Sequence, residues 1–339
     1  MKIITPEDHA SQQICVDPAI HRTHVKPISA PLHVVAVISN PSRFRTRYEL
    51  FRQFAKYVTD SGAILTTVEL ALRDRHFEVT TPGVPRTVQL RSPDQLWHKE
   101  NLINIGIRAL PADWEYVAWI DADVTFSRHD WVYETLHQLQ SYKVVQLFSH
   151  AQDLGPNGEP IQQFQSFCYS FRSGFPFPRI VNSARGKYTA GGHQWHPGYA
   201  WAARRSALSD VGLLGDIGIL GSGDHHMACA FIDRVRESIH GDMSYPYSRY
   251  WQRWQQRAIE SVRLDIGYVP GLLLHYWHGA KRDRKYVDRW QILTRNKFDP
   301  TEDIIRDAQG LWQLAGNKPQ LRDDIRDYFN QRNEDGIDV

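Results

Sequence analysis

The chain has 339 residues, of which 42% are hydrophobic, so it is long enough to bury a large core as one α/β unit or two small domains. Forty Lys and Arg side chains against 38 Asp and Glu give a formal net charge of +2, which excludes a polyelectrolyte binder and an acidic solvating chain. The three cysteines are widely spaced, which excludes a disulfide framework and a CxxC metal or redox motif.

The sequence has no window that approaches the roughly 18 uninterrupted apolar residues of a membrane span, and its start, MKIITPEDHASQQ, lacks the apolar core of a signal peptide. We therefore expect a cytoplasmic protein without a membrane span. The chain is also rich in Trp and His, with 11 and 16 copies. These side chains are typical of sugar, nucleobase and metal sites, although Trp more often lies in a core.

Residues 1–31 contain four prolines and little periodicity, so we expect an arm that lies on the main domain. Strand-like runs and helical spacing of apolar residues then alternate, with strands predicted at 33–38, 63–70 and 116–120 and helices at 44–55 and 95–110. This alternation predicts an α/β fold with a mostly parallel central sheet flanked by helices. Ligands of such sheets bind beyond the carboxyl ends of the strands.

The second half of the chain continues with a predicted strand at 144–148. Residues 152–192 are rich in Gly, Pro, Phe and polar side chains without a period, which indicates a long functional loop region. A strand at 199–203, a helix from 204, a Gly-rich loop at 215–223, a helix from about Asp224 and an apolar run at 268–274 follow. Helical spacing from residue 299 predicts a helical C-terminal cap. The expected organisation is an arm (1–31), a main domain (32–296) and a C-terminal helical extension (297–339).

Two carboxylates directly follow the predicted strand 116–120, in the sequence Asp121-Ala122-Asp123. Both side chains can turn toward the crevice if the chain leaves extended geometry there, and their repulsion then has to be offset by a cation or strong donors. A divalent metal held by Asp123 and Asp121 is the simplest answer. The alternative is an Asp-rich turn at a strand end.

Two imidazoles lie three residues apart in His275-Tyr276-Trp277-His278-Gly279, which follows an apolar run. They can converge on one ion if the segment is a turn or helical, whereas a pair of hydrogen-bonded core histidines is the alternative. A carboxylate oxygen from Asp123 and two imidazoles would suit Mn²⁺ or another borderline first-row ion better than Mg²⁺.

One acid follows the flexible segment Gly221-Ser222-Gly223 at the start of a predicted helix. Asp224 is explained either as a helix cap or as a general base that takes a proton from an incoming hydroxyl, and His225 is a second candidate for the base.

Arginines, an acid and an aromatic occur in the loops at 39–45 and 69–73, where they could bind phosphate, ribose or base. The segment 249–290 carries nine basic and four acidic residues with interleaved aromatics. It could receive a diphosphate or a nucleic-acid backbone, or it is an exposed helix face.

The order of these motifs resembles GT-A fold (Rossmann-like) glycosyltransferases, most closely the β-1,4-galactosyltransferase and polypeptide N-acetylgalactosaminyltransferase-like group. The resemblance runs from about residue 33 to 293. Besides Asp121-Ala122-Asp123, 221–226 and 275–279, it is carried by KENLINIG at 99–106, GYAWAARR at 198–205 and Arg289. Members of this group from eukaryotes work behind a signal anchor, so a bacterial or viral type is expected.

The resemblance implies a nucleotide-sugar donor, most commonly a UDP-sugar, held across a divalent ion, usually Mn²⁺. Asp123, His275 and His278 match the family's metal ligands, with His275 in place of Met, which widens the metal choice toward Mg²⁺. The residues that match or border the family's donor site are Ser39, Asn40, Arg43, Arg45, Glu69, Arg73, Lys99, Asn104, Asp121 and Ala122. Those expected to contact the acceptor or the sugar are Trp195, Gly198, Tyr199, Trp201, Gly223 and His226.

The implied activity is hexosyl or related transfer to an acceptor hydroxyl, with Asp224 or His225 as the base and inversion at the anomeric carbon if Asp224 serves. The family's acidic acceptor segment has only one acid here, so the base stays open between the two residues. The acceptor is a glycan, a small molecule or a modified nucleic acid. A glycosyltransferase acting on modified bases of nucleic acid and a metal-dependent phosphoester hydrolase are the alternative functions.

Overall fold

The computed structural model describes residues 28–175, 189–190, 193–285 and 288–337. Within these residues a seven-stranded sheet has the order β12-β6-β11-β4-β1-β2-β3. Its strands are β1 (Leu32–Ser39), β2 (Ile64–Leu72), β3 (Thr87–Ser92), β4 (Tyr116–Ile120), β6 (Val144–Gln146), β11 (Ala200–Arg204) and β12 (Ile266–Tyr268). β1 is parallel to β2 and β4, whereas β11 runs antiparallel to β4 and β6. The expected α/β class with a mostly parallel central sheet is confirmed.

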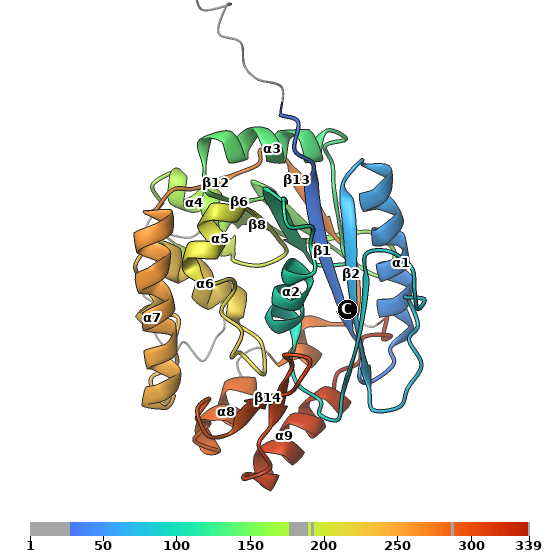
Figure 1. Ribbon diagram of the computed structural model, residues 1–339, viewed down its shortest axis with the longest axis vertical. Coiled ribbons are helices and arrows are strands. Elements are labelled where there is room, and N and C mark those ends of the chain that lie inside the picture. The colour runs from blue at the N-terminus through green and yellow to red at the C-terminus, as the bar shows by residue number, and fades with distance from the viewer. Residues whose placement is uncertain (1–27, 176–188, 191–192, 286–287, 338–339) are drawn as a thin grey trace, which may run out of the picture.

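Helices cover both faces of this sheet (Figure 1). Successive residues of β1 point to opposite faces, so Val34 packs in one core with α1 (Arg45–Asp60) and α3 (Trp131–Ser141), whereas Val35 packs in the other. The second core holds α2 (Lys99–Arg108), α5 (Arg205–Val211), α6 (Gly223–Phe231) and α7 (Tyr245–Val262). A Cβ on Gly106 would lie 2.5 Å from Val35 Cγ1, so glycine lets α2 approach β1 closely. Burial on both faces explains the continuous apolar run of β1.

A second sheet has the order β5-β13-β7-β8-β10-β9 in the described residues. Its strands are β5 (Val124–Phe126), β7 (His150–Leu154), β8 (Pro160–Ser166), β9 (Thr189–Ala190), β10 (His193–His196) and β13 (Leu272–His275), and α4 (Phe167–Arg172) follows β8. β5 begins directly after Asp123. Because β5 pairs with β13 in the register Val124 to His275, the two motifs that are far apart in the sequence lie side by side.

The short helix η3 (Val235–Glu237) lies between α6 and α7. The C-terminal part returns to the carboxyl end of β1 and contains the short helix η4 (Lys281–Arg284), α8 (Arg289–Arg295), the hairpin β14 (Ile304–Arg306) and β15 (Trp312–Leu314), and α9 (Pro319–Asn330). The Ser42 hydroxyl donates to the Phe329 carbonyl at 3.1 Å, which ties the end of α9 to the loop after β1.

Two predictions about secondary structure are wrong in part. The predicted loop 152–192 contains most of β7, β8 and α4, and residues 176–188 and 191–192 of it lie outside the described residues. β7 and β8 pair through their backbones although their sequences, HAQDL and PIQQFQS, lack apolar alternation. Residues 304–314 form a hairpin rather than a helix, because Asp307 and Gly310 supply a turn with Gly310 at φ +83°. The predicted helix is confirmed in α9 only.

Most of the expected N-terminal arm, residues 1–27, lies outside the described residues. Among the helices that the structure describes, none combines the length and the apolar character needed to cross a membrane.

Candidate active site

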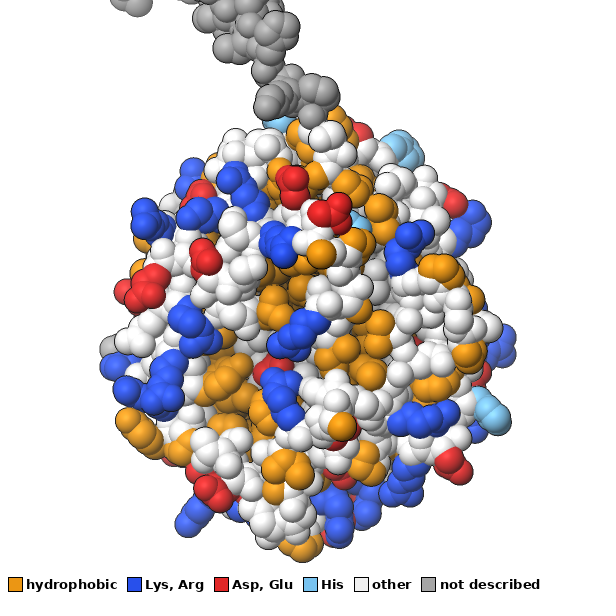
Figure 2. Space-filling model, in the orientation of Figure 1, with side chains coloured by type: hydrophobic (Ala, Val, Ile, Leu, Met, Phe, Trp, Pro, Cys, Tyr) orange, Lys and Arg blue, Asp and Glu red, His pale blue; other side chains and the backbone are white. Residues whose placement is uncertain are grey.

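A cavity of about 410 Å³ opens where β1 and β4 end. Its volume lies in the range of roughly 300–1,000 Å³ that is usual for small-molecule sites. The walls come from the loop after β1, the first turns of α2 and α6, residues 120–123, the segment 275–289 and residues 329–334. In Figure 2 apolar side chains lie at the centre of this face of the molecule, flanked by Lys and Arg side chains. The cavity therefore occupies the place that the parallel sheet predicts for a ligand.

Asp123, His275 and His278 form a compact cluster in this cavity. One Asp123 oxygen, Oδ2, lies 3.0 Å from His278 Nε2 and 3.9 Å from His275 Nε2, and the two Nε2 atoms are 3.2 Å apart. One ligand atom from each residue lies within 4.8 Å of the others, a spacing suited to a shared metal ion. Both histidines are buried. The structure thus brings together three of the four residues that the sequence nominated as metal ligands, the fourth being Asp121.

Asp153, which the sequence analysis did not single out, orients His275 from behind. His275 Nδ1 lies 2.9 Å from Asp153 Oδ1, which also accepts from the Tyr199 hydroxyl at 2.7 Å, and Lys281 forms an ion pair with the other carboxylate oxygen. Burial alone would raise the pKa of Asp153, but the hydrogen bond with His275 and the charge of Lys281 hold it below the usual value. The ionised carboxylate favours a proton on Nδ1, which leaves Nε2 of His275 free to face Asp123.

The donor atoms of the cluster fit a divalent first-row metal ion. Asp123 Oδ1 is buried and has no hydrogen-bond partner in the described part of the chain. Burial alone would raise the pKa of Asp123, but His278 and His275 lower it, so a carboxylate oxygen is available as an anionic ligand. One oxygen and two imidazole nitrogens are ligands that borderline ions such as Mn²⁺ or Zn²⁺ accept more readily than Mg²⁺ does.

Asp121 lies beside this cluster but has another partner. Its carboxylate forms an ion pair with the ammonium group of Lys99, the first residue of α2. Burial alone would lower the pKa of Lys99, whereas Asp121 and Asp224 raise it, so the ammonium group stays charged. Asp121 is thus held by Lys99, and it does not belong to the group of three residues whose ligand atoms lie close enough to share one ion.

Asp224 enters the cavity from the first turn of α6. The preceding Ser222 has φ +73°, and this left-handed turn directs the start of the helix toward the cavity. The Asp224 carboxylate accepts from the His225 amide at 2.8 Å, and a Cβ on Gly198 would lie 2.5 Å from its Oδ2. Burial alone would raise the pKa of Asp224, but the charge of Lys99 contributes to lowering it, so the carboxylate is ionised near neutral pH.

His225 and His196 also line the cavity. Burial lowers the pKa of His225 to about 4 and that of His196 to about 3, so both imidazoles are neutral near pH 7. The His196 ring stacks on Tyr199 with a centroid distance of 3.8 Å, and its Nδ1 accepts from the Gly198 amide at 3.0 Å. His225 therefore remains chemically able to accept a proton, as Asp224 does.

Glu100 is a second buried acid of the cavity that the sequence analysis did not identify as functional. It follows Lys99 in α2, its side chain packs against Gly223, and burial raises its pKa to about 8. Its separation from Asp224 by more than a hundred positions explains why no local motif contains both acids.

The cavity is lined by several cationic side chains, namely Arg47, Lys99, Lys281, Arg284, Arg289 and Arg332. Lys281, Arg284 and Arg289 belong to the basic segment 249–290, so an uneven charge distribution was the sequence signal for them. Arg47 and Arg332 gave no such signal. Of the aromatic residues in the same segment, Trp251 and Trp254 are buried in the core and provide no stacking surface.

Several predicted donor-site residues do not line the cavity: Arg43, Arg45, Glu69, Arg73 and Asn104. The Glu69 carboxylate accepts from the amides of residues 78–80 and holds the loop after β2. The Asn104 side chain bonds to Leu214 and Asp216. Ser39, Asn40, Lys99, Asp121 and Ala122 do line it.

Of the residues predicted to contact the acceptor or the sugar, some lie at the cavity and others are buried in the core. Tyr199 lines the cavity, and Gly198 and Gly223 pack directly behind Asp224 and Glu100. Trp195 and Trp201 are buried, with the Trp201 indole donating to the Pro197 carbonyl at 2.8 Å. His226 lies in the core, where its ring nitrogens contact Ser238 and Tyr247. Adjacent positions on a helix face different directions, which is why His225 and His226 have different surroundings.

The sequence matches no protein-family model and no curated protein. Among solved structures, the chain is similar to the catalytic domain of Drosophila β1,4-galactosyltransferase 7 in complex with xylobiose, at 11% identity and a TM-score of 0.39, covering 86% of this chain and 98% of that one. A mutant of the same enzyme with manganese, UDP-Gal and xylobiose gives 12% identity, a TM-score of 0.39 and coverage of 86% and 99%. S. aureus TarS in complex with UDP-GlcNAc gives 11% identity, a TM-score of 0.41 and coverage of 78% and 66%.

Proposed function

We propose that the protein is a metal-dependent glycosyltransferase that moves a sugar from a nucleoside diphosphate sugar to an acceptor hydroxyl. The observation that carries this proposal is the set of side chains that line one ligand-sized cavity. It holds the Asp123–His275–His278 cluster, a set of cationic side chains, and the ionised Asp224, which lies outside the cluster.

In this proposal Asp123, His275 and His278 hold a divalent ion, Mn²⁺ in the first place with Mg²⁺ as the alternative. When bound, the ion supplies positive charge that stabilises the diphosphate leaving group. Arg284 and Lys281 lie next to the cluster in sequence and line the same cavity, so their charges add to this stabilisation. Ser39, Asn40 and Ala122 also line the cavity, and we assign them to the nucleoside, most simply that of a UDP-sugar.

Asp224 is the proposed base. Its ionised carboxylate takes the proton from the acceptor hydroxyl while the acceptor oxygen attacks the anomeric carbon and the bond to the diphosphate oxygen breaks. This single displacement inverts the anomeric configuration. The neutral His225 is the alternative base, and a substitution that displaces Asp224 without meeting His225 separates the two.

The C-terminal extension belongs to the same catalytic unit in this proposal. Residues 32–296 form the main domain, and the extension from 297 contributes Phe329, Arg332 and Glu334 to the cavity wall. The extension is therefore expected to be needed for donor binding.

The proposal is tested by incubating the purified chain with a panel of UDP-sugars and Mn²⁺ and measuring release of UDP. Release that requires the metal and increases with a glycan or small-molecule acceptor supports transfer. Turnover of simple phosphoesters without UDP release would instead show a hydrolase. No UDP release with any UDP-sugar would contradict the UDP assignment, and the same panel with other nucleoside diphosphate sugars then decides whether the chain transfers sugars at all.

A further inference from the structure

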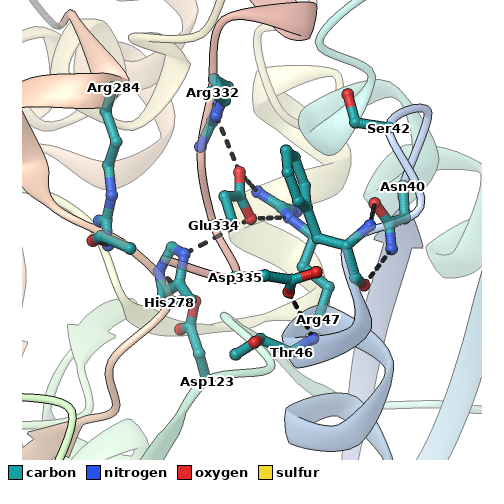
Figure 3. A network of polar contacts seen from close by, with 12 residues as sticks. Asn40, Ser42, Thr46, Arg47, Asp123, His278, Arg284, Arg332, Glu334 and Asp335 are labelled. Carbon is teal, nitrogen blue, oxygen red and sulfur yellow. Dashed lines mark hydrogen bonds and ion pairs between the residues drawn. The ribbon is translucent and has the colours of Figure 1, made fainter. Parts of the chain in front are cut away.

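The residues after α9 form a strap across one end of the cavity. We define this C-terminal strap as residues 331–337. The Asp335 carboxylate accepts from the Arg45 and Thr46 amides at 3.0 and 2.9 Å, at the start of α1, and the Trp277 indole donates to the Gly336 carbonyl at 2.7 Å. The strap therefore connects α1 to the segment that carries the two metal-ligand histidines (Figure 3).

Glu334 lies at the centre of these contacts. Arg332 Nε lies 2.8 Å from Glu334 Oε1 and Arg47 Nη2 lies 2.9 Å from the same oxygen, while Arg47 Nε forms an ion pair with Oε2. Oε2 is also 3.6 Å from Nδ1 of His278. Figure 3 shows the carboxylate between the two arginines and the imidazole.

The Glu334 carboxylate is only 3% exposed and contacts the guanidinium groups of Arg47 and Arg332. These contacts hold the carboxylate in place, because removing one partner of a buried ion pair leaves a buried charge without compensation.

Each histidine of the metal cluster has a carboxylate on its Nδ1 side, within hydrogen-bond distance for His275 (2.9 Å) and at 3.6 Å, an ion-pair distance, for His278. Asp153 faces Nδ1 of His275, Glu334 faces Nδ1 of His278, and Nε2 of both imidazoles points to Asp123. A carboxylate behind a histidine fixes the ring orientation and the tautomer and makes the ligating nitrogen more basic.

We propose that Glu334 is a positioning residue for the metal site, which holds His278 with Nε2 toward the ion and places Arg47 and Arg332 in the wall of the cavity. This inference rests on the proposed metal-dependent function. The C-terminal strap thereby helps to assemble the metal site.

The test is a Mn²⁺ titration of the full chain, followed by the electron paramagnetic resonance signal of free Mn²⁺, for the wild type, Glu334→Gln, Glu334→Asp and the control Asp327→Asn. Asp327 is an exposed acid of α9 that does not line the cavity. Glu334→Gln is expected to weaken Mn²⁺ binding about 10- to 100-fold, the usual effect of losing such a partner. Glu334→Asp keeps the negative charge but moves the carboxylate away from His278, so we expect an intermediate loss of Mn²⁺ affinity. The control Asp327→Asn is expected to bind Mn²⁺ with the affinity of the wild type.

A second measurement separates positioning from a general loss of structure. The Mn²⁺ concentration for half-maximal UDP release is expected to rise in Glu334→Gln, while saturating Mn²⁺ restores most of the rate. Unfolding curves recorded with a chelator show whether each variant is folded before metal is added.

The outcomes distinguish this inference from the proposed function. If the wild type binds Mn²⁺ and the folded Glu334→Gln variant binds it within twofold of the same affinity, the positioning role is overturned and the transferase proposal stands. If Glu334→Gln does not fold, Glu334→Asp decides, and wild-type affinity in that variant overturns the role. If the wild type binds neither Mn²⁺ nor Mg²⁺, both the positioning role and the metal-dependent function are overturned.

Discussion

The base assignment can be tested by replacing Gly198 with alanine. The new Cβ would lie 2.5 Å from Asp224 Oδ2, whereas ordinary van der Waals contact begins at 3.4 Å, so the carboxylate has to move by about 0.9 Å. Gly198 is not among the residues with positive φ, so its backbone accepts alanine. Since a misplacement of about 1 Å at a reacting group can reduce a rate ~10²-fold, we expect kcat to fall about 100-fold.

The assay is metal-dependent UDP release at saturating donor, together with the affinities for Mn²⁺ and UDP. Both affinities are expected to stay unchanged, because the nearest atoms that the new Cβ would meet belong to Asp224 and His196 and not to Asp123, His275 or His278. In an Asp224→Asn background, Gly198→Ala should reduce kcat little further, because the carboxylate that it displaces is already absent.

A Gly198→Ala variant with an unchanged kcat and a wild-type unfolding curve would refute the assignment. His225 would then be the remaining candidate for the base. A large loss in both affinities would instead show that the added methyl group disturbs the whole cavity, and the argument from Asp224 displacement would fail.

Four further substitutions test other parts of the site. Asp123→Ala and His278→Ala are each expected to abolish metal-dependent UDP release while the melting curve in chelator stays cooperative, and near-normal activity of either variant with metal removed would show that the cluster is not the metal site. Asp153→Asn is expected to weaken Mn²⁺ binding about 10- to 100-fold, measured by titration, because His275 loses its anionic partner, and an unchanged affinity would contradict the proposed orientation. Burial raises the pKa of Glu100 to about 8, so the native state keeps a proton that the unfolded chain releases near pH 4.5, and the free energy of unfolding should fall as pH rises from 5 to 8. Glu100→Gln removes this contribution, so urea unfolding at several pH values should show that the free energy of unfolding of the variant rises relative to that of the wild type as pH increases. A difference between the two proteins that stays constant with pH would contradict the raised pKa.

Much of the central sheet could be predicted because its signal is local. The Val-rich run of β1 and the strand before Asp121 are buried on both faces, and such strands are continuous apolar runs in the sequence. β7 and β8 could not be predicted in this way, because their sequences, HAQDL and PIQQFQS, lack apolar alternation and the strands pair through their backbones. The hairpin at 304–314 was missed because a turn at Asp307–Gly310 overrides an apolar spacing that also fits a helix.

The sequence alone determined which chemical groups stand at the ends of strands and at the start of a helix. These are the carboxylates after β4, the two imidazoles at and after the last apolar run, and Asp224 at the start of α6. Only the tertiary structure decided which of them share a cavity and what lies behind them. Arg47 and Glu334 are 287 positions apart, and Asp153 and His275 are 122 apart, so no local pattern links either pair. Hydrophobic periodicity is a property of neighbouring residues, whereas the site is formed by packing segments from the whole chain against one another, and that packing sets the partners of each charged group.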